Sequence, residues 1–485
     1  MINMDPDIPF TLTGLAAAIA DGRITAEAVA EDVLARCENM AHLNSIITQD
    51  AEVLLAAARA ADRHQSANEP LGPLHGVPIL IKDNIDVQGL PCSAGTAALE
   101  NDYPRQDATV VRRLRDAGAL IAGKANLFEL TLGGTGTNLH FGRTANPWRL
   151  EYTSGGSSSG SAAAVAARLV PGSLGTDTAG SVRIPSSFCG VAGFRPSFHR
   201  YPGDGLLPHS TTRDSVGVMA NSVADLAVLD AVVSGELSSL VSLDAFDIKE
   251  LDLAGIRIGR PRGAFCAALD ERTAAVMDSV ADLLADRGAI IVDADIPELH
   301  ELTPKCAWPI SIYESPRDLP AILAHRGTDV SIETLVAGIA SPVVKERFNP
   351  LVSLDKLEPP YRVAMSETRP RLQAILQHYF DHNELAAFMY PTTPFPAAAV
   401  DADDADVEIN GELVKHGFGH SIDNTVYQTA TGIPSLTLPA GLAPDHLPIG
   451  VGFDGPAGSD KQLLAIGRAF ERVRGPFPQP PHSNK

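Results

Sequence analysis

The chain has 485 residues, of which 45% are hydrophobic and 20% charged, and it contains 41 glycines and 36 prolines. This composition favours a large folded core joined by many turns and excludes a disordered chain. The net charge of −21 disfavours nucleic acid and anionic membranes as partners, because both require clustered Lys and Arg.

The N-terminal residues and the cysteines bear on location. Asp5 and Asp7 stand where a secretory signal peptide would be basic, so we expect no export signal. Nowhere do about 18 apolar residues run without a charge, so we expect no membrane span. The five cysteines are far apart and lack a CxxC spacing, which indicates reduced thiols and a cytoplasmic protein.

In chain order, the first element that the sequence predicts is a helix over residues 26–37, with Thr25 as its N-cap. The apolar run 74–81 then predicts a short buried strand that ends at Lys82. Pro78 lies within this run, which restricts it to the start of a strand or to a sheet edge.

Alternating helices and strands follow. A helix over 108–116 leads into a strand over 119–123, and a strand over 256–259 is followed by a helix over 273–285 and a strand over 289–292. Two strands joined through a helix in this way should be parallel. The sequence therefore predicts an α/β protein with layers of helices on its sheet.

The remaining segments divide into a cap and a return to the sheet. Residues 240–385 are richer in charge and in amphipathic helix, and we interpret them as a variable cap. Strand-like runs recur at 388–390, 436–438 and 449–453, before a final helix over 461–473. Strands at both ends of the chain predict one sheet that the C-terminus closes.

The segment most informative about chemistry is the Gly/Ser run 153–161, which opens the Ala-rich helical segment 162–169. A flexible linker is the simplest interpretation, but the run stands between structured segments. A phosphate loop lacks its closing Lys-Ser/Thr pair. The run also matches the GxSxG elbow around Ser158, but residues 146–154 before it look turn-forming rather than like the strand that motif needs.

A second small-residue segment, 175–185, surrounds Ser181. Together with Lys82 and with Ser157 in the segment 155–162, it resembles the amidase signature family. The spacings agree with that family, since 75 residues separate Lys82 from Ser157 and 24 separate Ser157 from Ser181.

Other segments extend the resemblance over nearly the whole chain. Two small residues depart from the pattern, because the family more often has Gly where Ser159 and Ala179 stand, and Ala179 limits the backbone angles of its loop. The matching segments are residues 76–84, 123–129, 189–196 and 432–441.

The resemblance implies one amidase signature domain over residues 1–485, with a large mixed, mostly parallel twisted sheet covered by helices on both faces. Its expected parts are an N-terminal helical region (1–65), a catalytic core (66–235), a variable helical cap insertion (240–385) and a C-terminal return to the sheet (386–485).

The resemblance also implies a catalytic set of Ser181, Ser157 and Lys82, with a cis peptide between Gly156 and Ser157. The residues support this set independently. A serine needs a base, and no histidine stands beside either loop motif. A lysine serves as a base when neutral, and the apolar run before Lys82 suits burial, which lowers a lysine pKa.

The loops around these residues are assigned to substrate binding and support. The backbone N–H groups of residues 178–181 would form an oxyanion hole, and Asp177 and Arg183 would orient that loop. The expected oxyanion and substrate-binding residues are Thr131, Gly133, Gly134, Thr178, Ala179 and Gly180, and the expected supporting residues are Asp177, Arg183 and Ser158.

We expect no cofactor and no metal. His416 and His420 are four residues apart, but Gly417 and Gly419 disfavour a helix there and no third ligand is evident. The acidic run 401–408 predicts a solvated loop, with a weak calcium site as the alternative.

Residues 200–214 and 453–467 resemble the indoleacetamide and mandelamide hydrolase branch of the family, which implies a small aryl-substituted primary amide as substrate. Candidate pocket walls are Trp308, Tyr313 and Phe348. Alternatives are an aryl-amide, carbamate or cyclic-amide hydrolase of the same mechanism, a glutamine-hydrolysing amidotransferase subunit, and a scaffold without activity, which the three retained catalytic residues disfavour. We expect a homodimer.

Overall fold

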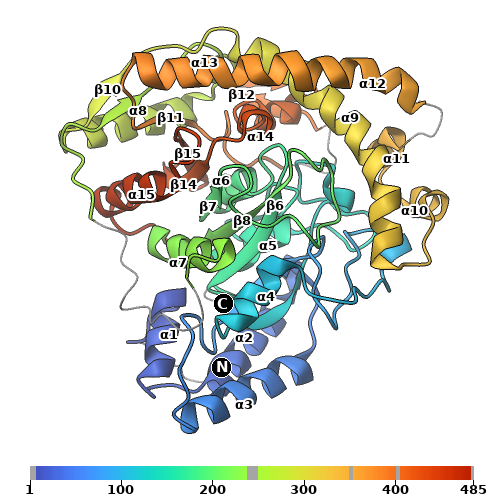
Figure 1. The fold of residues 1–485 in the computed structure, drawn as a ribbon. Coiled ribbons are helices and arrows are strands. Elements are labelled where there is room, and N and C mark those ends of the chain that lie inside the picture. Colours follow the sequence, from blue (N-terminus) through green and yellow to red (C-terminus); the bar gives the residue numbers. More distant parts are fainter. Residues whose placement is uncertain (1–6, 238–249, 349–352, 400–404, 482–485) are drawn as a thin grey trace.

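A computed structural model describes residues 7–237, 250–348, 353–399 and 405–481. Its centre is a sheet of eleven strands in the order β1-β3-β2-β6-β8-β7-β14-β15-β11-β9-β10, with two separate hairpins, β4–β5 and β12–β13 (Figure 1). The strands are β1 (Ile46–Thr48), β2 (Pro78–Lys82), β3 (Leu120–Ala125), β4 (Ala145–Asn146), β5 (Arg149–Thr153), β6 (Gly172–Asp177), β7 (Ala192–Arg195), β8 (Ser215–Ala220), β9 (Arg257–Gly259), β10 (Ile290–Val292), β11 (Ala387–Pro391), β12 (Val407–Ile409), β13 (Glu412–Val414), β14 (Ser435–Leu442) and β15 (Pro448–Asp454).

The sheet is mixed, as predicted. Parallel pairs join β3, β2 and β6 at one flank and β11, β9 and β10 at the other. The strands between these flanks pair antiparallel, so parallel pairing is less extensive than expected. The C-terminal strands β14 and β15 lie inside the sheet and join its two flanks, which confirms that the C-terminus completes it.

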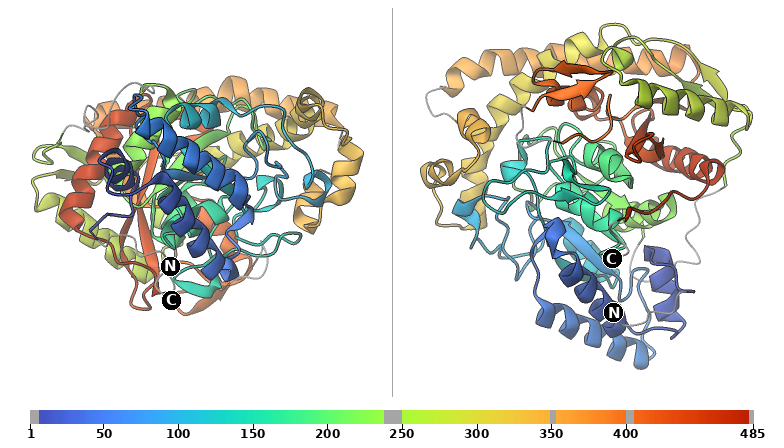
Figure 2. Two further views of the ribbon diagram at one scale, coloured as in Figure 1. Left: turned by 90° about the horizontal axis from the view of Figure 1, so that it is seen from below. Right: turned by 180° about the vertical axis from the view of Figure 1, so that it is seen from behind.

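Helices surround this sheet. Figures 1 and 2 show α1 to α3 at one end of the molecule and α9 to α13 as an outer arc at the other. The α-helices are α1 (Leu12–Ala20), α2 (Ala26–Asn39), α3 (Ala51–Ser66), α4 (Thr109–Asp116), α5 (Ser159–Ala166), α6 (Arg183–Cys189), α7 (Val223–Ser234), α8 (Glu271–Ala285), α9 (Leu299–Arg326), α10 (Ile332–Gly338), α11 (Pro342–Arg347), α12 (Leu354–Val363), α13 (Arg369–His382), α14 (Tyr427–Thr431) and α15 (Asp460–Arg474).

Strand β2 shows why an unbroken apolar run forms this layered structure. Ile79 and Ile81 belong to one hydrophobic cluster, while Leu80 between them belongs to another. Successive side chains of a strand point to opposite faces, so both faces of β2 are covered. Pro78 is the first residue of the strand, where its missing N–H is tolerated.

The local helix predictions hold closely. Thr25 is the N-cap of α2, and its side chain accepts a hydrogen bond of 3.1 Å from the N–H of Ala28. The predicted strand–helix–strand unit is present as β9, α8 and β10, with the two strands parallel. In the described ranges, no helix combines the length and the apolar character that crossing a membrane requires.

The cap is shorter than the expected segment 240–385. Residues 257–292 supply two strands to the main sheet, and among the described residues the part that has helices and no strands runs from Leu299 to His382. Within the expected loop 401–408, residues 401–404 lie outside the described residues. Its end differs from the prediction, because Val407 begins β12 and pairs with Val414 of β13.

Candidate functional site

Two neighbouring strands end at the candidate site. Strands β2 and β6 are parallel, with Ile81 opposite Leu174, so their carboxyl ends meet at one edge of the sheet. Lys82 is the last residue of β2, and Ser181 follows the end of β6 by four residues. Ser157 stands two residues before α5, which packs on both strands.

Lys82 and Ser157 are in direct contact. The Lys82 Nζ donates a hydrogen bond of 2.7 Å to the Ser157 Oγ and one of 2.8 Å to the Thr176 Oγ1. Both Lys82 and Ser157 are fully buried. The Gly156–Ser157 peptide is cis, as the resemblance implied.

Burial sets the protonation state of Lys82. Loss of hydration disfavours the ammonium and lowers the pKa of Lys82 from 10.5 to about 7, although the charges of Asp177 and Asp214 act in the opposite direction. A lysine with such a pKa is substantially neutral near pH 7 and has a lone pair with which to accept a proton.

Ser181 is the most accessible of the three residues, with 9% of its surface exposed. Its carbonyl accepts a hydrogen bond of 3.2 Å from the N–H of Ser158, which places it next to the Ser157 loop. Within the residues that the structure describes, the Ser181 hydroxyl makes no hydrogen bond. It is therefore available to an incoming molecule.

In the loop before Ser181, the backbone carbonyl groups of residues 178–180 all accept hydrogen bonds. The Thr178 carbonyl accepts from Arg213 Nη2 at 2.7 Å, and the Ala179 carbonyl accepts from Thr425 Oγ1 at 2.8 Å. The Gly180 carbonyl accepts from the N–H of Ile184. Since the C=O and N–H of one peptide point in opposite directions, the N–H groups of Ala179 and Ser181 point away from Arg213 and from the Ile184 N–H, respectively.

Gly180 is required where it stands. Its φ of 110° lies in a region that L side chains rarely adopt, and a Cβ there would be 2.2 Å from Thr425 Oγ1. Ala179 is not among the residues with positive φ, so alanine fits the loop where the family more often has glycine.

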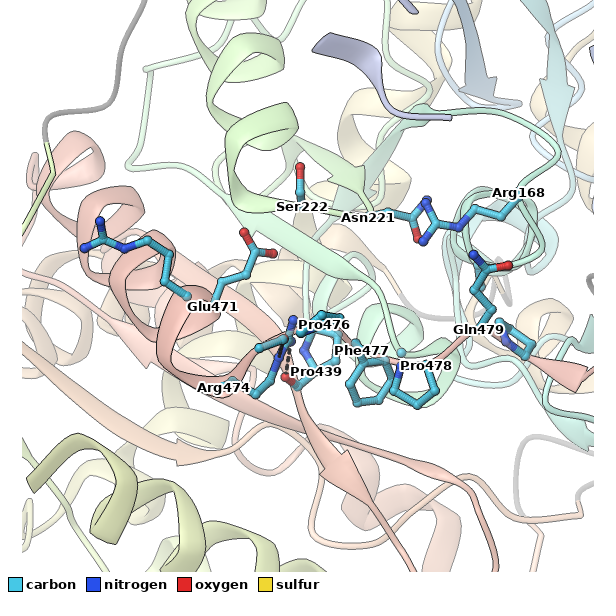
Figure 3. Close-up of a pocket in the computed structure, with 15 residues that line it drawn as sticks. Arg168, Asn221, Ser222, Pro439, Glu471, Arg474, Pro476, Phe477, Pro478 and Gln479 are labelled. Carbon is cyan, nitrogen blue, oxygen red and sulfur yellow. Dashed lines mark hydrogen bonds between the residues drawn. The ribbon is translucent and has the colours of Figure 1, made fainter. Parts of the chain in front are cut away.

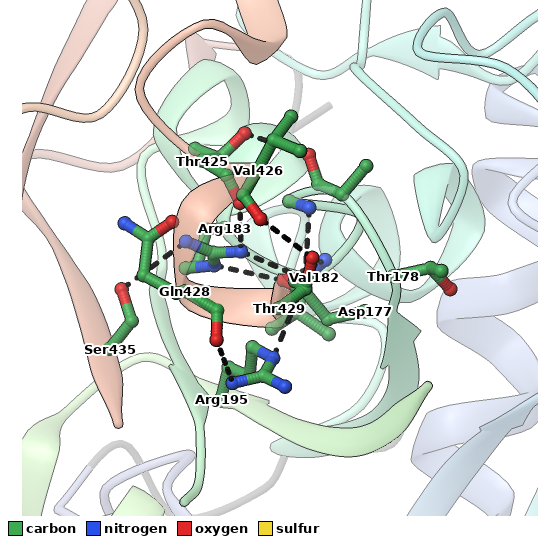
Figure 4. Close-up of polar contacts among 12 residues, drawn as sticks. Asp177, Thr178, Val182, Arg183, Arg195, Thr425, Val426, Gln428, Thr429 and Ser435 are labelled. Carbon is green, nitrogen blue, oxygen red and sulfur yellow. Dashed lines mark hydrogen bonds and ion pairs between the residues drawn. The ribbon is translucent and has the colours of Figure 1, made fainter. Parts of the chain in front are cut away.

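The Asp177 carboxylate accepts hydrogen bonds from this loop, and one of them comes from an expected oxyanion donor. The carboxylate accepts the N–H of Gly180 at 2.9 Å and that of Val182 at 3.1 Å (Figure 4). The Gly180 N–H is thus occupied. Arg183 donates to the same carboxylate from Nε at 3.0 Å and from Nη2 at 2.9 Å, and both side chains are fully buried.

Asp177 is stabilised in its ionised form by Arg183. Burial acts to raise the pKa of Asp177, but the charge and hydrogen bonds of Arg183, together with the charge of Arg195, outweigh it and hold the pKa below its ordinary value. Because the folded pKa is the lower one, the pair's contribution is present at neutral pH and is lost as pH falls through that folded pKa.

Replacing Arg183 by Met is expected to lower the free energy of unfolding by about 3–5 kcal/mol, because Asp177 would remain buried without its partner. The matched control is Lys305→Met, which breaks the exposed pair with Glu301 and should change stability by less than about 1 kcal/mol. Urea denaturation of both variants measures this, and equal losses would contradict the assigned role of the buried pair.

Ser158 does not fit the elbow alternative. Residues 149–153 do form a strand, β5, contrary to expectation, but β5 belongs to a hairpin outside the main sheet. The Ser158 side chain is fully buried, donates to the Thr176 carbonyl at 3.2 Å and accepts from the Thr176 N–H at 3.3 Å. Its hydroxyl supports β6 and does not face an open site.

The loop expected to contact substrate lies beside Ser157. The N–H of Phe128 donates to the Ser157 carbonyl at 3.0 Å, and a Cβ on Gly156 would lie 3.0 Å from the Gly133 carbonyl oxygen. Across from this loop, a Cβ on Gly134 would lie 3.5 Å from the Phe418 ring. The structure thus brings residues 131–134 next to the candidate catalytic residues.

Of the three candidate wall aromatics, Trp308 borders a cavity. With Ile422, Val426 and others it lines a space of about 320 Å³. Tyr313 instead stacks on Tyr361 with ring centres 4.4 Å apart, and Phe348 is buried in a cluster that includes Phe128.

A second cavity, of about 430 Å³, lies between α15 and the C-terminal segment (Figure 3). Its lining includes Arg168, Glu471, Arg474 and Phe477, and it holds none of the predicted catalytic residues. We therefore do not assign the predicted chemistry to it.

Several residues that hold the site together were not predicted. Thr176 contacts Lys82, Thr425 and Arg213 fix residues 178–180 (the expected oxyanion loop), and the Thr178 Oγ1 donates to Asp214 at 2.5 Å. Thr176 and Asp214 lie inside segments that carry the family resemblance. Nothing in the sequence around Thr425 indicates its contact, since it comes from a turn almost 250 residues away.

Comparisons with known proteins find amide hydrolases of similar sequence and structure. The family model described as Amidase matches residues 28–464. The indoleacetamide hydrolase of Rhizobium radiobacter is 39% identical, with 92% of this chain and 93% of that protein covered. The mandelamide hydrolase of Pseudomonas putida is 35% identical (98% and 93% covered). The crystal structure of an amidase superposes with a TM-score of 0.83 at 30% identity, covering 96% of this chain and all of the other.

Proposed function

This chain belongs to the amidase signature family of amide-hydrolysing enzymes, and we propose that it hydrolyses small aryl-substituted primary amides through Ser181, Ser157 and Lys82. The observation that carries the proposal is the 2.7 Å hydrogen bond between Lys82 and Ser157, in a fully buried setting that lowers the pKa of Lys82. The Lys82–Ser157 pair supplies a base and a proton carrier next to the accessible Ser181.

In the proposed first step, the Ser181 Oγ attacks the amide carbonyl carbon. The Ser181 proton passes to the Ser157 Oγ, while the Ser157 proton passes to the neutral Nζ of Lys82. The carbonyl oxygen becomes an oxyanion, and the N–H groups of Thr178, Ala179 and Ser181 are the proposed donors to it.

Collapse of this intermediate breaks the carbon–nitrogen bond. The Lys82 ammonium returns its proton through Ser157 to the leaving nitrogen, ammonia departs, and the acyl group stays on Ser181 as an ester. Water then attacks the ester by the same route, the ester bond breaks, and the carboxylic acid leaves with Lys82 neutral again. The site thus completes the cycle with its own three residues.

The aryl preference rests on the named relatives, an indoleacetamide hydrolase and a mandelamide hydrolase. The cavity of about 320 Å³ beside Trp308 is lined by Val426, which follows Thr425, whose hydroxyl donates to the Ala179 carbonyl. This cavity contains none of the three proposed catalytic residues, and its lining includes Asp423 and His300, so the proposal does not depend on it.

We expect phenylacetamide to be hydrolysed with a kcat/KM roughly 10- to 100-fold above that of acetamide, because burying the ring gains about 25 cal/mol per Å². Ammonia release from phenylacetamide, acetamide, an anilide and glutamine measures this preference. Faster cleavage of the anilide would favour the aryl-amide alternative, and preference for glutamine would favour the amidotransferase subunit.

We also propose that the protein is a cytoplasmic homodimer with one domain per chain. The scattered, unpaired cysteines support a reducing compartment. Sedimentation of the purified chain tests the dimer, and a single monomer boundary at all concentrations would contradict it.

A further inference from the structure

The loop from His209 to Asp214 reaches the oxyanion loop from the side of the cap. Asp214 is half-buried, and its Oδ1 accepts from the Thr178 Oγ1 at 2.5 Å. Its Oδ2 accepts the N–H groups of His209 at 2.8 Å and Ser210 at 3.0 Å. Both oxygens of this carboxylate are thus engaged, one by the oxyanion loop and one by its own loop.

The same loop is anchored in the cap helix α9. Arg213 donates to the Thr178 carbonyl at 2.7 Å and to the Ala307 carbonyl of α9 at 2.9 Å. Glu314 of α9 accepts from the Ser210 Oγ at 2.6 Å and from the N–H of Thr212 at 3.1 Å. Thr178 is therefore held at its side chain by Asp214 and at its carbonyl by Arg213. The loop that carries these two residues cannot shift without disturbing α9.

We propose that Asp214 is a positioning residue of the reaction, whose carboxylate fixes Thr178 at the start of the oxyanion loop and whose negative charge acts on Lys82 across the site. This inference rests on the proposed function, because it assigns Lys82 the role of base. It adds to that function a residue outside the three proposed catalytic groups.

The electrostatic part follows from the charges around Lys82. Burial raises the pKa of Asp214 to about 6, so Asp214 is ionised in the range where Lys82 loses its proton. Asp214 and Asp177 are the two anions that favour the Lys82 ammonium. The other titratable and charged groups facing this part of the site are His209, Arg213, Cys306, Glu314, Arg347 and Arg369.

Removing the charge of Asp214 therefore has a defined direction. With one anion fewer, the ammonium form of Lys82 is less favoured, and its pKa falls further below 10.5. The rise of kcat/KM with pH, which reports the free enzyme, then begins at lower pH. Loss of the Thr178 contact acts differently, because it misplaces the oxyanion donors and lowers the rate at every pH.

Three variants separate these effects, each assayed with phenylacetamide from pH 5 to 9 and checked by thermal unfolding. Asp214→Asn should lower the plateau of kcat by roughly 10- to 100-fold and move the acidic limb down by roughly half a pH unit. Thr178→Val should lower the plateau similarly with the limb unmoved, because the charge remains. Thr178→Ser keeps the hydroxyl and should recover most of the plateau that Thr178→Val loses.

A plateau and limb in Asp214→Asn equal to those of the unmodified enzyme would overturn the proposal, as would equal losses in Thr178→Val and Thr178→Ser. A uniform loss with an unmoved limb would overturn the action on Lys82. Should Asp214→Asn fail to fold, the two variants of Thr178 still test the hydrogen bond between Thr178 and Asp214. Failure of the proposed function would give a different result, because a fluorophosphonate would then not label Ser181 in the unmodified enzyme.

Discussion

Replacement of Ser181 by alanine is expected to reduce kcat by roughly 10⁴- to 10⁶-fold, because it removes the proposed nucleophile and leaves only the contribution of the proposed oxyanion donors and of binding. The fold should be unaffected, since the Ser181 hydroxyl makes no hydrogen bond within the described ranges. The unmodified enzyme should be modified once by a fluorophosphonate, and the Ser181→Ala variant should not be modified.

The sequence makes this labelling decisive. Trypsin cleaves after Arg149, Arg168 and Arg183, so Ser157 and Ser158 fall in the peptide 150–168 while Ser181 falls in the peptide 169–183. Mass spectrometry shows which of the two peptides carries the adduct, and fragmentation of that peptide identifies the serine, because 150–168 contains both Ser157 and Ser158 and 169–183 also contains Ser173. An adduct on Ser158 would contradict Ser181 as the nucleophile and would revive the elbow alternative.

Activity is expected to rise with pH through about 7 and reach an alkaline plateau, because only the neutral form of Lys82 accepts the proton from Ser157. Below the pKa of Lys82, kcat/KM should fall about tenfold per pH unit. Lys82→Met, which keeps the length and apolar packing of the side chain, should lose roughly 10³-fold or more.

The control is Lys124→Met. Lys124 is also a fully buried lysine, paired with Asp83 at 3.0 Å, but it does not contact Ser157. This variant should lose stability while the pH at which activity rises stays the same. A bell-shaped profile centred near pH 5, or normal rates for Lys82→Met, would contradict Lys82 as the base.

Much of the fold and of the site was accessible from local sequence. An apolar run that ends in a lysine specified β2, and the N-cap Thr25 specified the start of α2. The two small-residue segments carried enough of the family pattern to indicate Ser157, Ser181 and the cis peptide before Ser157. In each case the determining residues are neighbours in the chain.

The remainder depends on contacts between distant segments, which periodicity does not encode. Strands β14 and β15 take their places in the sheet by pairing with β7 and β11, which lie far from them in sequence. The contact of Asp214 with Thr178 depends in the same way on the pairing of β8 with β6, in which Ser215 lies opposite Asp177. The rule that proline interrupts a helix also fails in the cap. Helix α9 continues through Pro304, Pro309, Pro316 and Pro320, although each proline removes an intrahelical hydrogen-bond donor.

The buried position of Lys82 has a consequence for the folding equilibrium. In the unfolded chain this lysine titrates at 10.5, and in the folded chain at about 7, so between these pH values the unfolded chain binds one proton more. The difference favours unfolding by roughly 5 kcal/mol at neutral pH, which is comparable to the net stability of many domains. This penalty is greatest below the folded pKa and disappears as pH rises through 10.5. The packing of β2, β6 and α5 must therefore offset the free energy of unfolding that is lost because the pKa of Lys82 is lower in the folded chain.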